Sequence, residues 1–199
     1  MRTRLRRQAR RIRVIVYRET LIDSKEHFWT FVGAFVGIGL VGYLNQYWLK
    51  LADAPLLIGS FGASSVLIYG VINSPLAQPR NLLGGHLLSA FIGVTAHRLL
   101  PQELWLAAAL AVSLAIVGMQ VTKTLHPPGG ATALIAVIGS PQLKALGYWY
   151  LLTPVLTGAL ILLLVAVVFN NVTATRHYPA NKYWYRFWQR RYWTTPQQK

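Results

Sequence analysis

A stretch at 125–134, LHPPGGATAL, sets a histidine and a threonine around two prolines and two glycines in an apolar region. A helix that restarts after such a break exposes free amide groups and a partial positive charge, which bind anions readily. The imidazole of His126 could add a hydrogen bond and change its charge near neutral pH, or it could simply cap the helix. We therefore predict a small-anion site here. Its residues in this stretch are His126, Pro127, Pro128, Gly129, Gly130, Ala131 and Thr132.

A second stretch at 60–65, SFGASS, offers similar groups. The segment FGASSVLI at 61–68 aligns with GGATALIA at 129–136, so that Ser64 falls on Thr132. Serine hydroxyls can donate hydrogen bonds to an anion, and glycine lets a ligand approach the backbone. We predict that the two helix starts face each other near the middle of a membrane. The binding residues from this stretch are then Ser60, Gly62, Ala63, Ser64 and Ser65.

Four polar residues between the two stretches are candidates for a pore mouth or a gate. They are Gln78, Arg80, Asn81 and His86. Arg80 could attract anions to one mouth, or it could be an ordinary interfacial cation. His86 could instead be a hydrogen-bonded packing residue.

The distribution of charge identifies an integral membrane protein. Between residues 55 and 175 the charged residues are Arg80, Arg98, Glu103, Lys123 and Lys144. Apolar windows in this region reach the length of about 20 residues that a helix needs to cross the hydrocarbon core. Full spans are expected at roughly 28–48, 81–99, 104–122 and 147–170, with a short helix beginning near 60 and another near 128.

The short segments leave two topologies open, because a helix of roughly 13 residues is only ~20 Å long. We predict an all-α protein of about six membrane helices, namely four full spans and two short or re-entrant helices. The helices form two similar halves, at about 27–100 and 103–172. If each half crosses the membrane three times, the halves are inverted. Interrupted helices in inverted halves mark the binding site of many transporters.

The net charge of +15 is concentrated at the two ends of the chain. The first 18 residues contain eight arginines and no acid, and the segment after Asn171 also lacks acids. Basic flanks stay on the cytoplasmic side. We therefore expect a basic cytoplasmic segment at 1–26, a transmembrane domain at 27–173 and an aromatic and basic interfacial tail, also cytoplasmic, at 174–199. Lipid headgroups account for these charges, so no nucleic acid is expected as a partner.

Several classes of function are disfavoured. The chain has no cysteine and no histidine spacing typical of a metal site, and it lacks the hydrolase and phosphate-loop motifs. We therefore expect no enzyme activity, cofactor or metal. No acidic residue lies within an expected span, and carboxylates are the usual groups on cation and proton paths, so cation coupling is disfavoured. Glycine-rich helix faces favour a homo-oligomer.

Three segments carry a resemblance to a known family: SPLAQPRN at 74–81, GGH at 84–86 and TLHPPGGATAL at 124–134. They resemble the HPP family of integral membrane proteins, over roughly residues 25–173. Members are usually described with four membrane spans, and those of cyanobacteria and chloroplasts are associated with nitrite transport. The resemblance thus implies a nitrite transporter or channel. It places the family signature on His126 to Gly130 and on Ser74, Pro75, Gln78, Pro79, Arg80 and Asn81, without assigning their roles.

The bacterial plasma membrane is the expected location, and a chloroplast or thylakoid membrane is the alternative. Three other functions stay open. The first is transport of another small solute, such as nitrate, formate or a neutral molecule. The second is a membrane scaffold without a pore, and the third is a membrane enzyme.

Overall fold

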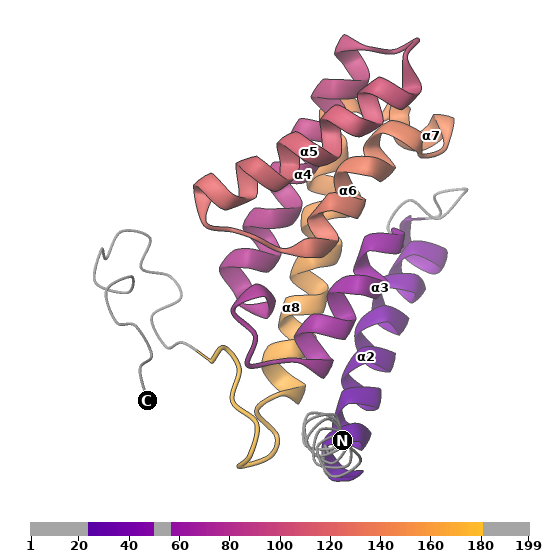
Figure 1. The fold of residues 1–199 in the computed structure, drawn as a ribbon. Helices are drawn as coiled ribbons and strands as arrows, with labels where there is room; N and C mark the ends of the chain where they lie inside the picture. Colours follow the sequence, from indigo (N-terminus) through magenta and orange to yellow (C-terminus); the bar gives the residue numbers. More distant parts are fainter. Residues whose placement is uncertain (1–23, 50–56, 181–199) are drawn as a thin grey trace, which may run out of the picture.

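The described part of the chain is a bundle of helices without strands (Figure 1). The computed structural model describes residues 24–49 and 57–180. Its α-helices are α2 (Ser24–Leu44), α3 (Gly59–Ser65), α4 (Pro79–Leu99), α5 (Leu104–Thr122), α6 (Pro127–Ile138), α7 (Pro141–Ala145) and α8 (Thr157–Phe169). Short π-helical turns are η1 (Asn45–Leu49), η2 (Val66–Gly70) and η5 (Leu152–Leu156), and 3-10 turns are η3 (Pro75–Ala77) and η4 (Gly147–Leu151).

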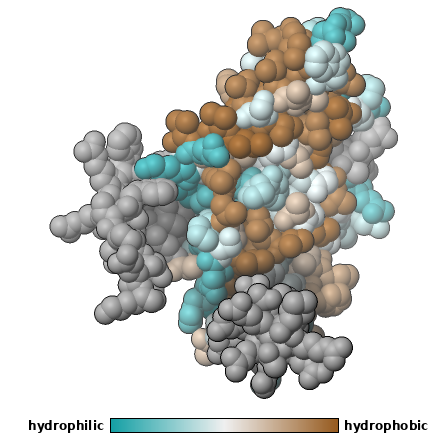
Figure 2. Space-filling view, in the orientation of Figure 1, coloured by the Kyte–Doolittle hydropathy of each residue, from teal (hydrophilic) through white to brown (hydrophobic). Residues whose placement is uncertain are grey.

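Within residues 24–49 and 57–180, three helical stretches are long and apolar enough to cross a membrane: Ser24–Tyr47, Leu104–Thr122 and Gly147–Phe169. The fourth long helix, α4, has 21 residues like α2, but its composition is more polar. Large apolar side chains such as Phe35 and Val121 are exposed on the outside, and Figure 2 shows apolar residues over much of one face. Such a surface suits a lipid solvent. The predicted all-α integral membrane fold is confirmed.

The last predicted span is less regular than the sequence suggested. We expected one helix from Gly147 to about Asn170, but the backbone of Thr153 is non-helical, with φ −133° and ψ 117°. Proline disfavours the α conformation of the residue before it, and Pro154 follows directly. The turns η4 and η5 therefore precede α8 in place of a continuous helix.

Both predicted short helices are present. α3 continues into η2, and together they cover Gly59–Gly70; α6 has 12 residues. At 1.5 Å per residue each is ~18 Å long, well short of a hydrocarbon core of about 30 Å. His126 is the residue that caps α6, and the prolines that follow suit a first turn because they have no amide hydrogen to leave unpaired.

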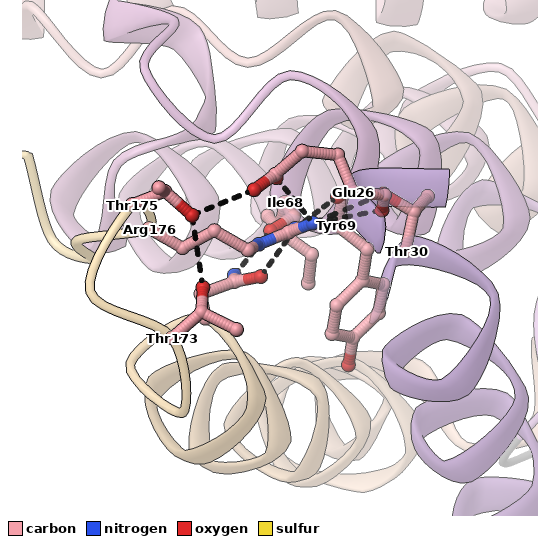
Figure 3. Close-up of polar contacts among 8 residues, drawn as sticks. Glu26, Thr30, Ile68, Tyr69, Thr173, Thr175 and Arg176 are labelled. Atoms are coloured by element: carbon pink, nitrogen blue, oxygen red, sulfur yellow. Dashed lines mark hydrogen bonds and ion pairs between the residues drawn. The ribbon is translucent and has the colours of Figure 1, made fainter. Parts of the chain in front are cut away.

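Side chains that follow α8 donate hydrogen bonds to the carbonyl groups at the end of η2. Asn170 Nδ2 donates to the carbonyl of Ile68 at 2.7 Å, and the buried Arg176 donates to the carbonyl of Tyr69 at 2.7 Å. Figure 3 shows the Arg176 guanidinium reaching between η2 and α2, where it also pairs with Glu26 at 3.1 Å. A helix can stop within a membrane only if its last carbonyls find such partners.

The Glu26–Arg176 ion pair also joins the first described helix to the segment after the last one. The two ends of the described chain therefore lie at the same end of the bundle, as Figure 1 shows. This arrangement agrees with an even number of crossings. Most of the predicted basic segment at 1–26 and of the tail at 174–199 lies outside the described residues.

The small face of α4, which carries Gly85, Ser89 and Gly93, is the surface on which α6 packs. A Cβ atom on Gly93 would lie 2.5 Å from the carbonyl oxygen of Ala133, and one on Gly85 would lie 2.6 Å from the Cβ of His126. Real Cβ atoms do not approach other atoms so closely. Glycine therefore lets the backbones of α4 and α6 come close enough to set His126 against α4.

The glycines of α2 serve packing within the protomer. Gly33 and Gly37 are buried beneath the ring of Tyr69, which would meet a Cβ atom at either position. Gly39 and Gly42, in contrast, have no neighbour within 4 Å of a Cβ position among the described residues. The close-packing glycine pair of α2 is therefore covered by η2.

Candidate functional site

Five polar side chains with no exposed surface meet inside the bundle. They are Ser60 and Ser64 of α3, His86 of α4, His126 at the start of α6, and Thr132 of α6. We call these residues the polar cluster. Buried polar groups are costly unless they find hydrogen-bond partners, and here the partners are other members of the same cluster.

Ser64 lies between the two imidazole rings. Its Oγ atom is 2.7 Å from Nε2 of His86 and 2.9 Å from Nε2 of His126, and the ring centroids are 5.0 Å apart. Ser64 Oγ also lies 3.1 Å from the carbonyl oxygen of Ser60. A hydroxyl has a single hydrogen to donate, so Ser64 must accept from at least one histidine if both contacts are hydrogen bonds.

The other ring nitrogen of His86 faces Thr132. His86 Nδ1 is 2.7 Å from Thr132 Oγ1, which is in turn 2.9 Å from Ser60 Oγ. Ser64 and Thr132, which the sequence repeat aligns with each other, thus bond to opposite nitrogens of one imidazole. His86 is therefore the residue that bridges the two short helices.

A backbone carbonyl fixes the hydrogen position on His126. Its Nδ1 atom lies 2.8 Å from the carbonyl oxygen of Leu76. Because a carbonyl can only accept, Nδ1 carries a hydrogen. In the neutral ring the Nε2 atom that faces Ser64 is then an acceptor.

The pairing of side chains gives the direction of the two short helices. Ser60 contacts Thr132 and Ser64 contacts His126, so residue numbers rise along α3 as they fall along α6. The helices are antiparallel, and the start of each lies beside the second turn of the other. We predicted that the two helix starts face each other; instead they overlap, so that side chains rather than helix ends meet.

Aromatic side chains enclose the polar cluster. The ring of Phe61 packs edge-on against His86, with centroids 5.5 Å apart, and the Tyr150 hydroxyl donates to the carbonyl of Thr132 at 3.1 Å. Hydrogen bonds in such apolar surroundings are stronger than in water, and an unpaired polar group is more costly. With both histidines neutral, the five side chains of the cluster carry no charge.

A family model described as HPP, transmembrane region, matches residues 19–179. This chain belongs to the HPP family. Two transmembrane proteins of Dictyostelium discoideum are similar to it. One is 46% identical over 171 residues, which cover 84% of this chain and 59% of the relative; the other is 45% identical over 160 residues, which cover 79% and 51%. The chain thus spans less than two thirds of these curated relatives, and no solved structure matches it.

The two HPP signature segments are joined in space. Arg80 donates to the carbonyl of Thr122 and Asn81 to that of Leu125, each at 2.8 Å. Both contacts hold the loop that leads into His126. The side-chain amide of Gln78 donates to the carbonyl of Ile72 at 2.9 Å. These three residues, predicted to line a mouth, therefore shape the backbone around the cluster, and their contact with a solute stays a prediction.

The remaining predicted binding residues lie around the cluster and outside its hydrogen bonds. Gly62, Ala63 and Pro127 are exposed, while Gly130 and Ala131 are half-buried. Gly129 and Pro128 are buried in helix packing, and a Cβ atom on Gly129 would lie 2.7 Å from Ser89 Oγ. Ser65 Oγ is buried, with no hydrogen-bond partner among the described residues.

Sequence reasoning missed three features of this HPP site. His86 was expected at a pore mouth or as a hydrogen-bonded packing residue; it is buried and hydrogen-bonded, as the second alternative has it, but its place between Ser64 and Thr132 at the centre of the cluster was not predicted. Its spacing from Ser89 and Gly93 is three and seven residues, a helical period that places it on the small face of α4. The Tyr150 hydroxyl and the Leu76 carbonyl had no such signal, because only the tertiary fold brings them to the cluster.

Proposed function

We propose that this HPP-family protein carries a small monovalent anion across a membrane, and that the anion binds where α3 and α6 overlap. One observation carries the proposal: Ser64 and Thr132, from different short helices, bond to opposite nitrogens of His86 in a fully buried cluster. Convergent polar groups at the crossing of two interrupted helices are typical of transporter binding sites.

The chemistry of the cluster favours an anion over a cation. Its hydroxyl and imidazole groups can all donate hydrogen bonds. No carboxylate belongs to the cluster, whereas cation paths usually have one. Among small anions, nitrite is the one that the family resemblance suggests, and its two oxygens could bond to Ser64 and Thr132 together.

The cluster as described is closed, since its side chains contact one another directly. We propose that α3 and α6 separate during transport, so that a solute replaces the contacts between them. The two helices belong to different halves of the chain, and movement of one half against the other is how many transporters alternate access. In this scheme the halves are inverted repeats, both termini are cytoplasmic and protomers associate as a homo-oligomer.

The experiment that tests this function is uptake of nitrite into proteoliposomes of the purified protein. Alkaline external pH suppresses leakage of the neutral acid, and nitrate, formate and chloride serve as competitors. Saturable uptake that exceeds that of empty liposomes would support anion transport, and the competitors would rank the substrates. Uptake equal to that of empty liposomes, by folded protein, would exclude nitrite. Transport of another solute, a scaffold or an enzyme would then be the next hypothesis.

A matched pair of variants locates the site. Ser64→Ala removes the hydroxyl between the two histidines, and we expect nitrite uptake to fall at least tenfold, the order of effect of one or two lost buried hydrogen bonds. Ser113→Ala removes an exposed hydroxyl that bonds only to its own helix in α5, at 2.7 Å from the carbonyl of Ala109 and 3.3 Å from that of Leu110. That variant should keep wild-type uptake. Equal uptake by both variants would place the path elsewhere.

A further inference from the structure

The polar cluster forms one unbroken series of hydrogen bonds in the order Ser60, Thr132, His86, Ser64, His126. The successive distances are 2.9, 2.7, 2.7 and 2.9 Å, and the series ends 2.8 Å further on, at the carbonyl of Leu76. Each member is a hydroxyl or an imidazole, which can both donate and accept a hydrogen. The series crosses the overlap of the short helices, from the first turn of α3 to the start of α6.

In one direction Thr132 Oγ1 donates to Ser60 Oγ, the direction that the heavy-atom angles favour. His86 Nδ1 must then donate to Thr132, and Ser64 must donate to His86 Nε2. Since Nδ1 of His126 donates to Leu76, the contact between His126 Nε2 and Ser64 is a hydrogen bond only if Nε2 also carries a hydrogen. In this direction all four contacts are hydrogen bonds when His126 is an imidazolium, and the Ser64 hydrogen points to His86 rather than to the carbonyl of Ser60, 3.1 Å away.

The opposite direction satisfies the same contacts with one proton fewer. Ser60 then donates to Thr132, Thr132 to His86 Nδ1, His86 Nε2 to Ser64, and Ser64 to Nε2 of a neutral His126. Passage between the two arrangements moves one hydrogen across each of the four bonds, and one proton enters or leaves at Ser60 Oγ. No electrons are exchanged, and His86 changes only its tautomer.

We propose that this series is a proton relay that charges His126 while the cluster is closed, before an anion enters between α3 and α6, so that one proton and one anion cross together. The inference rests on the proposed function and adds the coupling ion to it. An anion in a buried site needs a compensating charge, and the cluster has none while both histidines are neutral. An imidazolium at His126 supplies that charge without a carboxylate, the group whose absence made proton coupling look unfavourable from the sequence.

Other titratable groups on the surrounding elements do not replace the imidazoles. These groups are Arg80, Lys123, Tyr150 and Tyr178. The hydroxyls of Tyr150 and Tyr178 donate to the carbonyls of Thr132 and Ala77, and Arg80 donates to that of Thr122. In these contacts the donors face backbone oxygens, so the two histidines remain the groups of the cluster that can gain a proton.

The test measures initial nitrite uptake with and without a proton gradient of about one pH unit, acid outside. A pH-sensitive dye inside the vesicles records the protons that enter. For the wild type we expect severalfold faster uptake with the gradient, and acidification of the interior that follows nitrite. Thr132→Val breaks the relay at a hydroxyl and should lose the response to the gradient, whereas Thr132→Ser restores the hydroxyl and should regain it. Leakage of the neutral acid is the same in all vesicles.

The outcomes separate the relay from the proposed function. Saturable wild-type uptake that ignores the gradient and brings no protons would overturn the relay and leave anion transport standing. A full response to the gradient in Thr132→Val would also overturn it. No saturable uptake by the wild type would overturn both proposals. If Thr132→Val fails to fold, as judged by its size-exclusion profile, His86→Gln takes its place, because an amide keeps hydrogen bonds but cannot pass a proton.

Discussion

At the scale of single residues, hydrogen bonds between matched donors and acceptors hold the polar cluster together, and charge does not. Each ring nitrogen of His86 and His126 has an oxygen atom within 2.9 Å, and two different helices and a turn supply these partners. Loss of one member leaves its partners buried without water to replace it. Such a loss costs more free energy than one hydrogen bond contributes, because the group left without a partner stays desolvated and forms no compensating bond.

Replacement of His86 by alanine tests this dependence. We expect His86→Ala to lower the free energy of unfolding by roughly 2–5 kcal/mol, since it orphans Ser64 and Thr132 and leaves a cavity. His27→Ala, at an exposed position on α2, should change the stability by less than about 0.5 kcal/mol. Denaturant unfolding in detergent checks both values. Equal stabilities of the two variants would contradict the role given to His86.

A second prediction concerns Tyr178, which lies after the last span. Burial raises the pKa of its phenol, and its hydroxyl donates to the carbonyl of Ala77 at 2.7 Å. The unfolded chain would ionise this group near its usual pKa of about 10, before the folded protein does. Its contribution to stability is therefore complete below about pH 10 and is lost as the pH rises further. Between about pH 9 and 11 the free energy of unfolding should fall less steeply with pH for Tyr178→Phe than for the wild type. Equal slopes would contradict this role of Tyr178.

At the scale of elements, the sequence predicted the helices well and their contacts only in part. The short helices near 60 and 128 were predicted from the sequence around them, and the structure contains both. The antiparallel overlap of α3 and α6 was not predictable, because the contacts that join them, Ser60 with Thr132 and Ser64 with His126, are between residues more than 60 positions apart in the sequence. The kink at Thr153 was predictable from Pro154 but was missed.

The close approach of α4 and α6 gives a prediction with a control within the chain. Gly93→Ala would set a methyl group 2.5 Å from the backbone oxygen of Ala133, which cannot move away cheaply. We expect a loss of about 1–3 kcal/mol of stability from overpacking. Gly39→Ala meets no neighbour within 4 Å among the described residues and should be neutral or stabilising by up to about 1 kcal/mol. Thermal unfolding measures the stability of both variants. No loss of stability in Gly93→Ala would contradict the close packing of α4 against α6.

At the scale of the whole molecule, the two ends of the described chain are joined to each other at one end of the bundle. Arg176 connects Glu26 of α2, Asn170 after α8 and the end of η2 (Figure 3). A guanidinium has a fork of donors that can serve several oxygens at once. The segment after α8 is therefore part of the fold up to at least this arginine.

Removal of this arginine should weaken the whole bundle. We expect Arg176→Ala to cost about 3 kcal/mol, because the carbonyl of Tyr69 and the side chain of Asn170 lose their partner in a buried site. Arg98→Ala is the matched control, since Arg98 is exposed and stacks on Tyr148 at 4.7 Å; its cost should be roughly 0.5–1 kcal/mol. Unfolding in detergent compares the two, and a cost for Arg176→Ala no larger than that of Arg98→Ala would contradict the account.

We propose that a solute passes where α3 and α6 overlap. A reversible cross-link between these two helices tests this path. The chain has no cysteine, so Ser60→Cys with Thr132→Cys introduces one unique pair at positions whose side-chain oxygens are 2.9 Å apart. We would measure nitrite uptake by this variant before oxidation, after disulfide formation and after reduction. We expect oxidation to stop saturable uptake and reduction to restore it. Unchanged uptake with the disulfide fully formed would contradict passage between the short helices.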